Sequence, residues 1–338
     1  MKKLLLSLSL CGLCTSALSQ DKSEQDDNKE GKRWYAFTFE NDLFAFSDDG
    51  FTNGVAYAWG YGSYDKLEEQ PAPKWIKGFN SKLGLYGKHA DKFAVGYGLA
   101  QGMYTPDNIE TSELVEDDRP YAGTLLWNTR SRAYDNKIAN SRGLTLGIIG
   151  PAAMAEQAQK FIHDITNGTE PMGWDHQIQN EAVFRLDAEH TRRLYASHSD
   201  FFDVSSYSIG GLGNLRSDIG TGLIFRLGDS LAETYAYVDP DPARSINTSA
   251  ARFGSEFQWQ FQFAMHALYV FNDITIDGNT FKDSHSVDLI NEQAIASIGL
   301  SATWHDWSAT FAMMRGTDTF EGQLTDTQFG AISIGYHH

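Results

Sequence analysis

A strict alternation of bulky apolar residues with small or polar residues is the feature that most constrains the fold of this chain. Its clearest example is the segment 256–266, where aromatic residues and Met265 fall on one face and glutamines and His266 fall on the other. Side chains of a β-strand point alternately to opposite faces, so this pattern predicts strands. The same pattern recurs in residues 51–61, 93–100, 219–226 and 332–337.

Two classes of β-protein alternate in this way. A soluble sandwich buries its apolar face and exposes a polar one. Here the second face is often Gly, Ala, Ser or Gln, which suits a crowded barrel lumen, whereas the bulky aromatic face suits lipid and its interfacial girdles. No run of eighteen apolar residues follows the N-terminal segment, so no transmembrane helix is expected. The sequence therefore predicts an all-β protein, a transmembrane antiparallel β-barrel.

The alternation predicts about twelve strands, and an even number is usual for bacterial barrels. Most of the segments reach the ~9–11 residues that a tilted strand needs to cross a bilayer. Proline-containing stretches at 71–73 and 239–242 are expected to form long irregular connections at the end of the barrel opposite the motifs described below. The expected strands are residues 33–40, 51–62, 92–103, 121–134, 142–150, 178–191, 201–214, 217–228, 254–277, 288–303, 306–316 and 327–337.

The N-terminal residues carry an export signal. Lys2 and Lys3 precede an apolar stretch that is followed by small residues, which predicts a secretory signal over residues 1–19. Residues 20–33 are highly charged, so we expect a disordered lead-in. A single barrel domain is then expected over residues 34–338.

Cysteine content and charge exclude several classes of function. Both cysteines, Cys11 and Cys14, fall inside the predicted signal, so neither disulfide nor thiol chemistry is expected in the exported chain. Loss of Lys2 and Lys3 changes the formal net charge from −17 to −19. Such an acidic chain is not expected to bind nucleic acid, but it attracts divalent cations.

One stretch, residues 150–177, is predicted to contain a helix rather than a strand. Good helix formers fill residues 152–165, and Pro151 suits the first turn of a helix. Asn167-Gly168 then supplies a stop. We therefore expect one helix in an extracellular loop.

Residues of this expected helix also point to function. Gln159 and His163 lie four residues apart and share one helix face, while Ala158, Ile162 and Ile165 are spaced to dock the helix against a neighbouring surface. A single helix in a β-protein is typical of a functional insertion, because structured loops are where sites usually lie. A helical plug or lid with a surface histidine remains the alternative.

Strand parity places the polar clusters of the sequence on one rim. If the first strand starts in the periplasm, every connection from an odd to an even strand lies outside the cell. Four clusters then converge, as a functional site requires. They are residues 40–44, residues 52–54, the loop from Tyr104 to Gly123, and the helix with Gln159 and His163 followed by residues 174–181.

These clusters contain six short motifs that occur in order through the first half of the exported chain. They are FENDLF (39–44), FTNG (51–54), MYTP (103–106), DDRPYAG (117–123), GP followed by Gln159 and His163 (150–163), and GWDHQIQNE (173–181). Together they resemble the outer-membrane lipid A 3'-O-deacylase family. The resemblance implies a twelve-stranded barrel whose site lies between the outer wall and a helix from an extracellular loop. It also implies calcium-dependent ester hydrolysis that removes acyl chains from the lipid A of lipopolysaccharide.

The resemblance assigns roles to individual residues. His163 matches the general base of the family, and Gln159 matches its partner on the helix face. Asn41 and Asp42 match the pair at the metal and oxyanion site, and Thr52 matches the threonine that opens the second strand. We therefore expect His163, Gln159, Asn41 and Thr52 to be catalytic, and Asp42 with Asn41 to bind Ca²⁺.

Two departures from the family pattern concern the surroundings of this site. The family has a lysine in the loop after its equivalent of Tyr104, whereas this chain has none between Tyr104 and Tyr121. Its acidic residue after the histidine aligns with Thr169, with Glu170 beside it. The missing lysine bears on substrate positioning more than on chemistry. Arg119 and Glu170 are the residues that we expect to contact the substrate.

The residues alone support the same chemistry. The sequence has no GxSxG motif, and its cysteines lie in the signal, so a covalent acyl-enzyme has little support. What remains is a water nucleophile with a histidine base and a metal. Calcium suits the oxygen ligands of Asn41 and Asp42, although His163 and His176 keep zinc as an alternative.

The first interpretation is therefore a lipid A deacylase, expected to be a monomeric, multi-pass protein of the bacterial outer membrane. Three other functions remain open. The chain can be a non-catalytic outer-membrane barrel, such as a pore or a surface-binding protein, which the missing lysine favours. It can be an outer-membrane phospholipid acyl hydrolase with the same chemistry. It can also be a soluble periplasmic β-protein that binds an apolar ligand.

Overall fold

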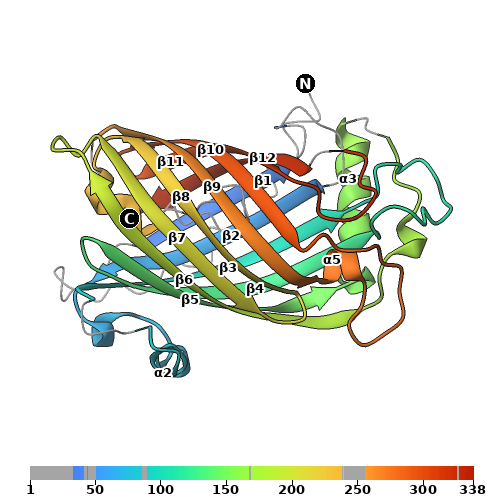
Figure 1. The fold of residues 1–338 in the computed structure, drawn as a ribbon, viewed down its shortest axis with the longest axis horizontal. Coiled ribbons are helices and arrows are strands. Elements are labelled where there is room, and N and C mark those ends of the chain that lie inside the picture. Colours follow the sequence, from blue (N-terminus) through green and yellow to red (C-terminus); the bar gives the residue numbers. More distant parts are fainter. Residues whose placement is uncertain are drawn as a thin grey trace, which may run out of the picture.

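The computed structural model is a closed barrel of twelve antiparallel strands, in which each strand pairs with the next and β12 pairs with β1 (Figure 1). It describes residues 33–41, 44, 51–85, 90–166, 169–237, 239, 256–325 and 327–338. The predicted signal and nearly all of the predicted lead-in therefore lie outside the described residues. The predicted fold class is confirmed.

Every expected strand is present, and no strand end differs from its expected position by more than five residues. The strands are β1 (Arg33–Asn41), β2 (Phe51–Tyr64), β3 (Lys92–Tyr104), β4 (Ala122–Tyr134), β5 (Ile138–Ile149), β6 (Glu181–Ala196), β7 (Phe202–Leu212), β8 (Arg216–Gly228), β9 (Gln258–Asp273), β10 (Glu292–Trp304), β11 (Trp307–Gly316) and β12 (Thr327–His337). Their alternation fixes the register, because a slip by one residue would turn every lumenal side chain outward.

The two faces of the strands differ as the alternation predicts. On β9, Gln260 and His266 are buried in the lumen, while Met265 is 45% exposed on the outer wall. Phe37 on β1 and Ile334 on β12 are likewise exposed, at 49% and 51%. A continuous apolar outer surface of this kind is stable against lipid rather than water.

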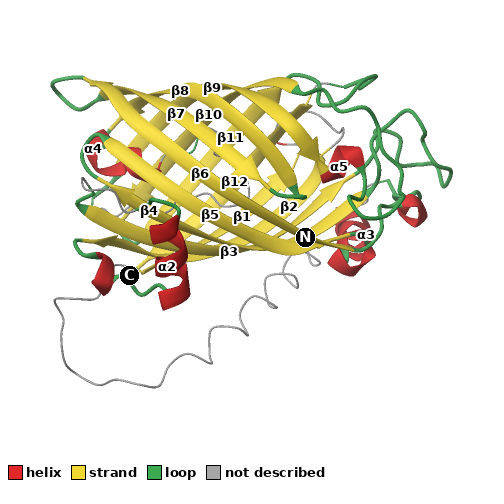
Figure 2. Cartoon of the chain, turned by 60° about the horizontal axis from the view of Figure 1, so that its bottom comes forward, coloured by secondary structure: helices red, strands yellow, loops and turns green. Residues whose placement is uncertain are grey.

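The two ends of the barrel carry different helices (Figure 2). At one end, called the α3 end, lie α3 (Ala155–Thr166) and α5 (Ile274–Asp277), in connections from odd to even strands. At the other end lie α2 (Lys74–Lys82) and α4 (Leu231–Thr234). No helix among the described residues is both long and apolar enough to cross a membrane. Short 3₁₀ turns are η3 (Leu67–Glu69), η4 (Pro151–Ala153), η5 (Trp174–His176) and η6 (Tyr235–Tyr237).

The connection after β2 is irregular at residues 71–73, as predicted, but a large part of it is helical, contrary to the prediction. It contains α2, which starts directly after Pro73, and Ile76 and Asn80 on one face of this helix are buried. Proline is compatible with a helix start, so the two prolines of this stretch did not exclude a helix. Of the second predicted irregular stretch, 239–242, only Asp239 is described.

The connection after β8 folds into the lumen at the end opposite α3. Tyr235 and Ala236 pack with Trp34 and Tyr134 in a buried cluster. The hydroxyl of Tyr235 donates to the carbonyl oxygen of Ile138 at 3.1 Å. Side chains of the protein itself therefore occupy this end of the lumen, and the predicted motifs converge at the α3 end.

Candidate active site

Helix α3 lies against the outer wall of the barrel, over β3 and β4. Gly123 makes the close approach possible, because a methyl group there would lie 2.5 Å from the Cβ of Ala155. Nε2 of Gln101 on β3 donates to the carbonyl oxygen of Ala153 at 2.6 Å, just before the helix. The helix is therefore attached to the lipid-facing side of the wall, not to the lumen.

An apolar contact completes the docking of α3. Ala158 and Ile162 pack against a buried cluster, which confirms the face predicted from their spacing. The cluster consists of Met103, Tyr121, Ala155 and Trp174. The side chain of Ile165, the third residue of the predicted face, is not among those described.

Left-handed backbone at two positions turns the chain from β5 onto the outer wall. Gly150 has φ of 102° and Met154 has φ of 58°, the first of which glycine adopts without strain. Pro151 lies between them and opens η4, so it begins a 3₁₀ turn before α3 rather than α3 itself. The backbone N–H of Ala152 donates to Oδ1 of Asn180 at 2.7 Å.

Gln159 is completely buried between α3 and the wall. Nε1 of Trp174 donates to Oε1 of Gln159 at 2.7 Å. An indole N–H can only donate, so this contact settles which end of the amide is the oxygen. Nε2 of Gln159 has no hydrogen-bond partner among the described residues. A buried donor left without a partner costs about 1–3 kcal/mol, so this amide is a candidate for binding a ligand oxygen.

Trp174 is itself held by Tyr121, with 5.0 Å between the ring centroids. Gly173 allows this packing, because a methyl group there would lie 2.5 Å from Cε2 of Tyr121. Burial raises the pKa of Tyr121 to about 12, so its hydroxyl stays neutral at physiological pH. The two rings therefore form a neutral support for the Gln159 amide.

His163 lies one turn after Gln159 on α3 and is partly exposed. Its Nδ1 donates to the carbonyl oxygen of Thr169. A carbonyl can only accept, so Nδ1 carries the proton and Nε2 of the neutral ring keeps its lone pair. The acidic residue that the family pattern places after the histidine is replaced here by a main-chain oxygen at the aligned position.

Asn41 ends β1 at the α3 end of the barrel and is 7% exposed. Glu40 beside it lines a lumenal cavity, so strand alternation turns Asn41 to the outer face, which also carries α3. Asp42 lies outside the described residues. Thr52 lies in β2 at the same rim, but its side chain is not described. The structure therefore brings Asn41 to the same end and the same face of the wall as α3.

The ligands for a metal are described only in part. Within the described ranges, no group of three or more His, Cys, Asp or Glu is arranged to hold a metal ion. The carboxamide oxygen of Asn41 suits a hard cation such as calcium. Gln159 does not suit it, because its oxygen is bound by Trp174. Nε2 of His176 donates to the carbonyl oxygen of Ser112 at 3.0 Å, so that nitrogen is engaged as a donor rather than as a zinc ligand.

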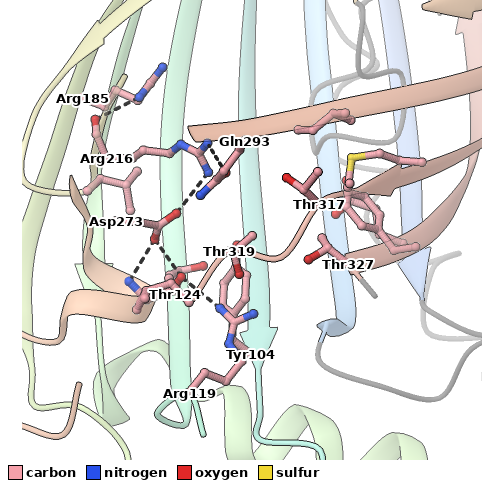
Figure 3. Close-up of a pocket in the computed structure, with 18 of the residues that line it drawn as sticks. Tyr104, Arg119, Thr124, Arg185, Arg216, Asp273, Gln293, Thr317, Thr319 and Thr327 are labelled. Carbon is pink, nitrogen blue, oxygen red and sulfur yellow. Dashed lines mark hydrogen bonds and ion pairs between the residues drawn. The ribbon is translucent and has the colours of Figure 1, made fainter. Parts of the chain in front are cut away.

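The two residues predicted to contact substrate lie in different surroundings. Glu170 is exposed beside α3, where its charge acts on Lys160. Arg119 instead reaches the lumen, where its guanidinium lies 4.8 Å from the ring centroid of Tyr104. Its Nη2 donates to Oγ1 of Thr275 at 3.1 Å (Figure 3). The barrel wall therefore separates Arg119 from α3.

Sequence reasoning missed three parts of the site: the wall contact at Gly123, the amide partner Trp174 and the carbonyl of Thr169. Gly123 and Trp174 stand inside motifs that were chosen for their polar residues. The glycine and the tryptophan of those motifs were the available signal. A main-chain carbonyl leaves no signal in a sequence.

The sequence as a whole shows the family of this chain. A family model described as outer membrane protein LpxR matches residues 4–338. The chain belongs to this family. The protein is therefore a multi-pass barrel of the bacterial outer membrane, and the soluble periplasmic alternative is wrong. The motif resemblance drawn from the first half of the chain is confirmed.

One solved structure shows the same fold. LpxR from Salmonella typhimurium matches with a TM-score of 0.73 and 17% identity, over 90% of this chain and 99% of that one. The β domain of the Bordetella autotransporter BrkA matches with a TM-score of 0.44 and 10% identity, over 91% of this chain and 99% of that one. No curated protein matches the sequence.

Proposed function

We propose that this protein is a lipid A 3'-O-deacylase, which hydrolyses an acyl ester of lipid A in the outer leaflet with a water molecule activated by His163. The observation that carries the proposal is the arrangement of His163 and Gln159 on α3. An imidazole with a fixed Nδ1 proton lies one turn from a buried amide whose N–H₂ has no partner among the described residues. Membership of the LpxR family supports the same function.

Each group on α3 suits one part of ester hydrolysis. Nε2 of His163 takes a proton from water, and the hydrogen bond from Nδ1 to Thr169 orients the ring and stabilises the cation that forms. Nε2 of Gln159 donates to the ester carbonyl and to the oxyanion that develops on it. Because Trp174 holds the amide in place, this donor needs no rearrangement during the reaction.

The surface beside α3 suits acyl chains. Phe161 on α3 is 64% exposed, and Met154, just before the helix, and Met172, in the segment after it, are 61% and 53% exposed. Such side chains are stable in contact with lipid acyl chains. This favours a membrane lipid over a soluble ester as substrate.

Calcium is part of the proposal. Asn41 and Asp42 would hold the ion at the end of β1, and Asn41 supplies a buried carboxamide oxygen of the kind that calcium prefers. When bound, the ion would polarise the ester carbonyl. The proton transfers are assigned to His163, not to the metal.

The test uses purified protein in detergent micelles with hexa-acylated lipid A, and the products are measured by mass spectrometry. We expect loss of one 3'-linked acyl chain, its abolition by a calcium chelator and its recovery on addition of calcium. His163→Ala should lower the rate by ~10²–10⁴-fold. His190→Ala is a matched control, because His190 lies on β6, away from α3, and its side chain bonds Asn140.

Two results would contradict the proposal. Hydrolysis of phospholipid in preference to lipid A would show that the protein is a phospholipid acyl hydrolase. Absence of hydrolysis by folded protein would show that it is a non-catalytic barrel. A closed barrel is verified on a gel by the different migration of boiled and unboiled samples.

A further inference from the structure

A cavity of about 260 Å³ lies in the lumen at the α3 end, on the opposite side of the wall from the candidate active site. Strands from all around the barrel contribute to it, including Glu40 of β1, Thr124 of β4, Arg185 of β6 and Gln293 of β10. Figure 3 shows charged and hydroxyl side chains pointing into this space. The cavity is large enough for one small ligand and too small for a lipid.

Four of the charges in and beside the cavity neutralise one another. Arg185 donates to Asp218 at 2.8 Å, and Arg216 bridges Asp218 at 2.8 Å and Asp273 at 3.1 Å. Asp273 also accepts from the backbone and hydroxyl of Thr275, at 3.0 and 2.7 Å. These two cations and two carboxylates therefore form a balanced network.

Arg119 reaches this network only through the hydroxyl of Thr275, which donates to Asp273. Its guanidinium lies over Tyr104 and donates to the neutral hydroxyl of Thr275, and it has no salt bridge among the described residues. Its Nε is buried and has no hydrogen-bond partner among those residues. Burial lowers the pKa of Arg119, yet a guanidinium stays protonated at neutral pH. The cavity therefore holds a cation with an unused donor.

The loops fix the position of Arg119. Oδ1 of the preceding Asp118 accepts from the backbone N–H of Arg119 at 2.7 Å, and the carbonyl of Asp118 accepts from Nε2 of His285 at 2.8 Å. The hydroxyl of Thr325 donates to Asp107 at 3.1 Å and joins the loop before β4 to the connection before β12. The cation is therefore held in place before any ligand arrives, which lowers the entropy lost on binding.

Hydroxyl groups line the other side of the cavity. Thr317, Thr319 and Thr327 face it from the β11–β12 region (Figure 3). Glu40 of β1 also lines the cavity. The Thr319 hydroxyl donates its proton to Oε1 of Gln323 at 3.0 Å. The hydroxyls of Thr317 and Thr327 accept from the N–H of Ala294 at 3.1 Å and from Nε2 of Gln323 at 2.9 Å, so each keeps a proton to donate, whereas a carboxylate only accepts. Apolar side chains such as Ile295, Met314 and Phe329 line the rest of the cavity. A small ligand with hydroxyl groups and an anion for Arg119 therefore suits this lining.

We propose that this lumenal cavity binds an acidic sugar of monosaccharide size, with its carboxylate or phosphate on Arg119 and its hydroxyls on the threonines and Glu40. The source is either a free sugar acid or an acidic sugar of lipopolysaccharide that reaches over the rim. This inference does not rest on the proposed deacylase activity, because the barrel wall separates the two sites.

The test is calorimetric titration of the full-length exported chain in detergent with glucuronate, glucose 6-phosphate, inorganic phosphate and glucose. The two acidic sugars should bind at least ~10-fold more tightly than glucose, since a hydrogen bond to a charged group is worth roughly this factor or more. Arg119→Gln should weaken acidic sugars ~10-fold or more, and Arg119→Lys should restore part of the loss. Arg192→Gln, an exposed arginine of β6 at the opposite end, should change nothing.

Several outcomes would overturn the inference. Equal binding of glucuronate by wild type and folded Arg119→Gln would exclude Arg119 as the anion site. Equal binding of glucose and glucuronate by wild type would exclude it even if the variant failed to fold. Inorganic phosphate bound as tightly as the acidic sugars would exclude a sugar site. Competition by lipopolysaccharide micelles would support the lipid-linked source, and its absence would support the free sugar.

Discussion

At the α3 end, the outer face of the wall and the ion-pair network on its lumenal face bury polar groups in opposite ways. On the lumenal face, Arg185, Asp218, Arg216 and Asp273 satisfy one another in a balanced network. On the outer face, Gln159 is buried in an apolar frame and keeps a donor without a partner among the described residues. The difference indicates that the ion-pair network stabilises the barrel, whereas the Gln159 amide is positioned to bind a ligand.

One short segment of the chain contributes side chains to both the lumenal and the outer face of the wall. In the loop before β4, Arg119 points into the lumen, and Tyr121, two residues later, packs on the outer face against Trp174. Both are fixed by the same short stretch of backbone. We therefore expect changes in the lumenal ion-pair network to alter mainly stability, and changes on the outer side to alter mainly the rate of hydrolysis.

The largest expected effect is on stability, from the lumenal network. Asp218→Ala leaves Arg185 and Arg216 without their shared carboxylate, so the free energy of unfolding should fall by about 3–5 kcal/mol, as for other broken buried ion pairs. Denaturant titration in micelles measures this change in the free energy of unfolding. The control is Asp65→Ala, which breaks an exposed pair with Lys92 and should change stability little. A small effect of Asp218→Ala would mean that the network is not structural.

The second effect is on catalysis, from the buried amide. Gln159→Leu removes the unpaired donor at similar volume, and the rate of deacylation should fall by ~10²–10³-fold, as expected for one oxyanion donor. Trp174→Phe removes the indole N–H that orients the amide and part of the buried ring, but it leaves the Gln159 donor in place, so it should cost less. If Gln159→Leu keeps full activity in a folded barrel, Gln159 is a packing residue.

A moderate effect is expected at the contact between α3 and the wall. Gly123→Ala places a methyl group 2.5 Å from the Cβ of Ala155, so α3 must shift outward and the rate should fall roughly 10-fold, the scale expected for catalytic groups displaced by a fraction of an ångström. Gly210→Ala on β7 is the control, because a methyl group there meets nothing within 4 Å. Equal rates for the two variants would show that α3 docks loosely.

The smallest effect is expected at Thr169. Its carbonyl, not its side chain, holds Nδ1 of His163, so Thr169→Ala should change the rate of deacylation by no more than about twofold. A loss of 10-fold or more in the same rate measurement would show instead that the threonine hydroxyl acts in the site.

The barrel was predictable because its signal is repeated. Each strand carries the same two-residue alternation, so errors of a few residues at the ends did not change the strand count or the parity of the connections. Helix α3 was predictable because a run of residues that favour a helix replaces the two-residue alternation there. Helix α2 was missed because only two buried residues, Ile76 and Asn80, define its inner face.

The site was predictable only as far as side chains define it. Gln159 and His163 were found from their spacing on one helix, and Asn41 from its motif and the parity of the strands. Arg119 lies in a loop, where no periodic pattern determines whether a side chain points to the lumen or to the outer face. The role of the Thr169 carbonyl depends on how the chain returns after α3, which tertiary packing decides.

The most direct test of the outer-face site is the lipid A mass spectrum of cells with hexa-acylated lipid A that produce the protein. Wild type and His190→Gln should each shift lipid A by the loss of one acyl chain, whereas His163→Gln should leave it unshifted in an equally well folded barrel. A shift that persists in His163→Gln would contradict an active site under α3.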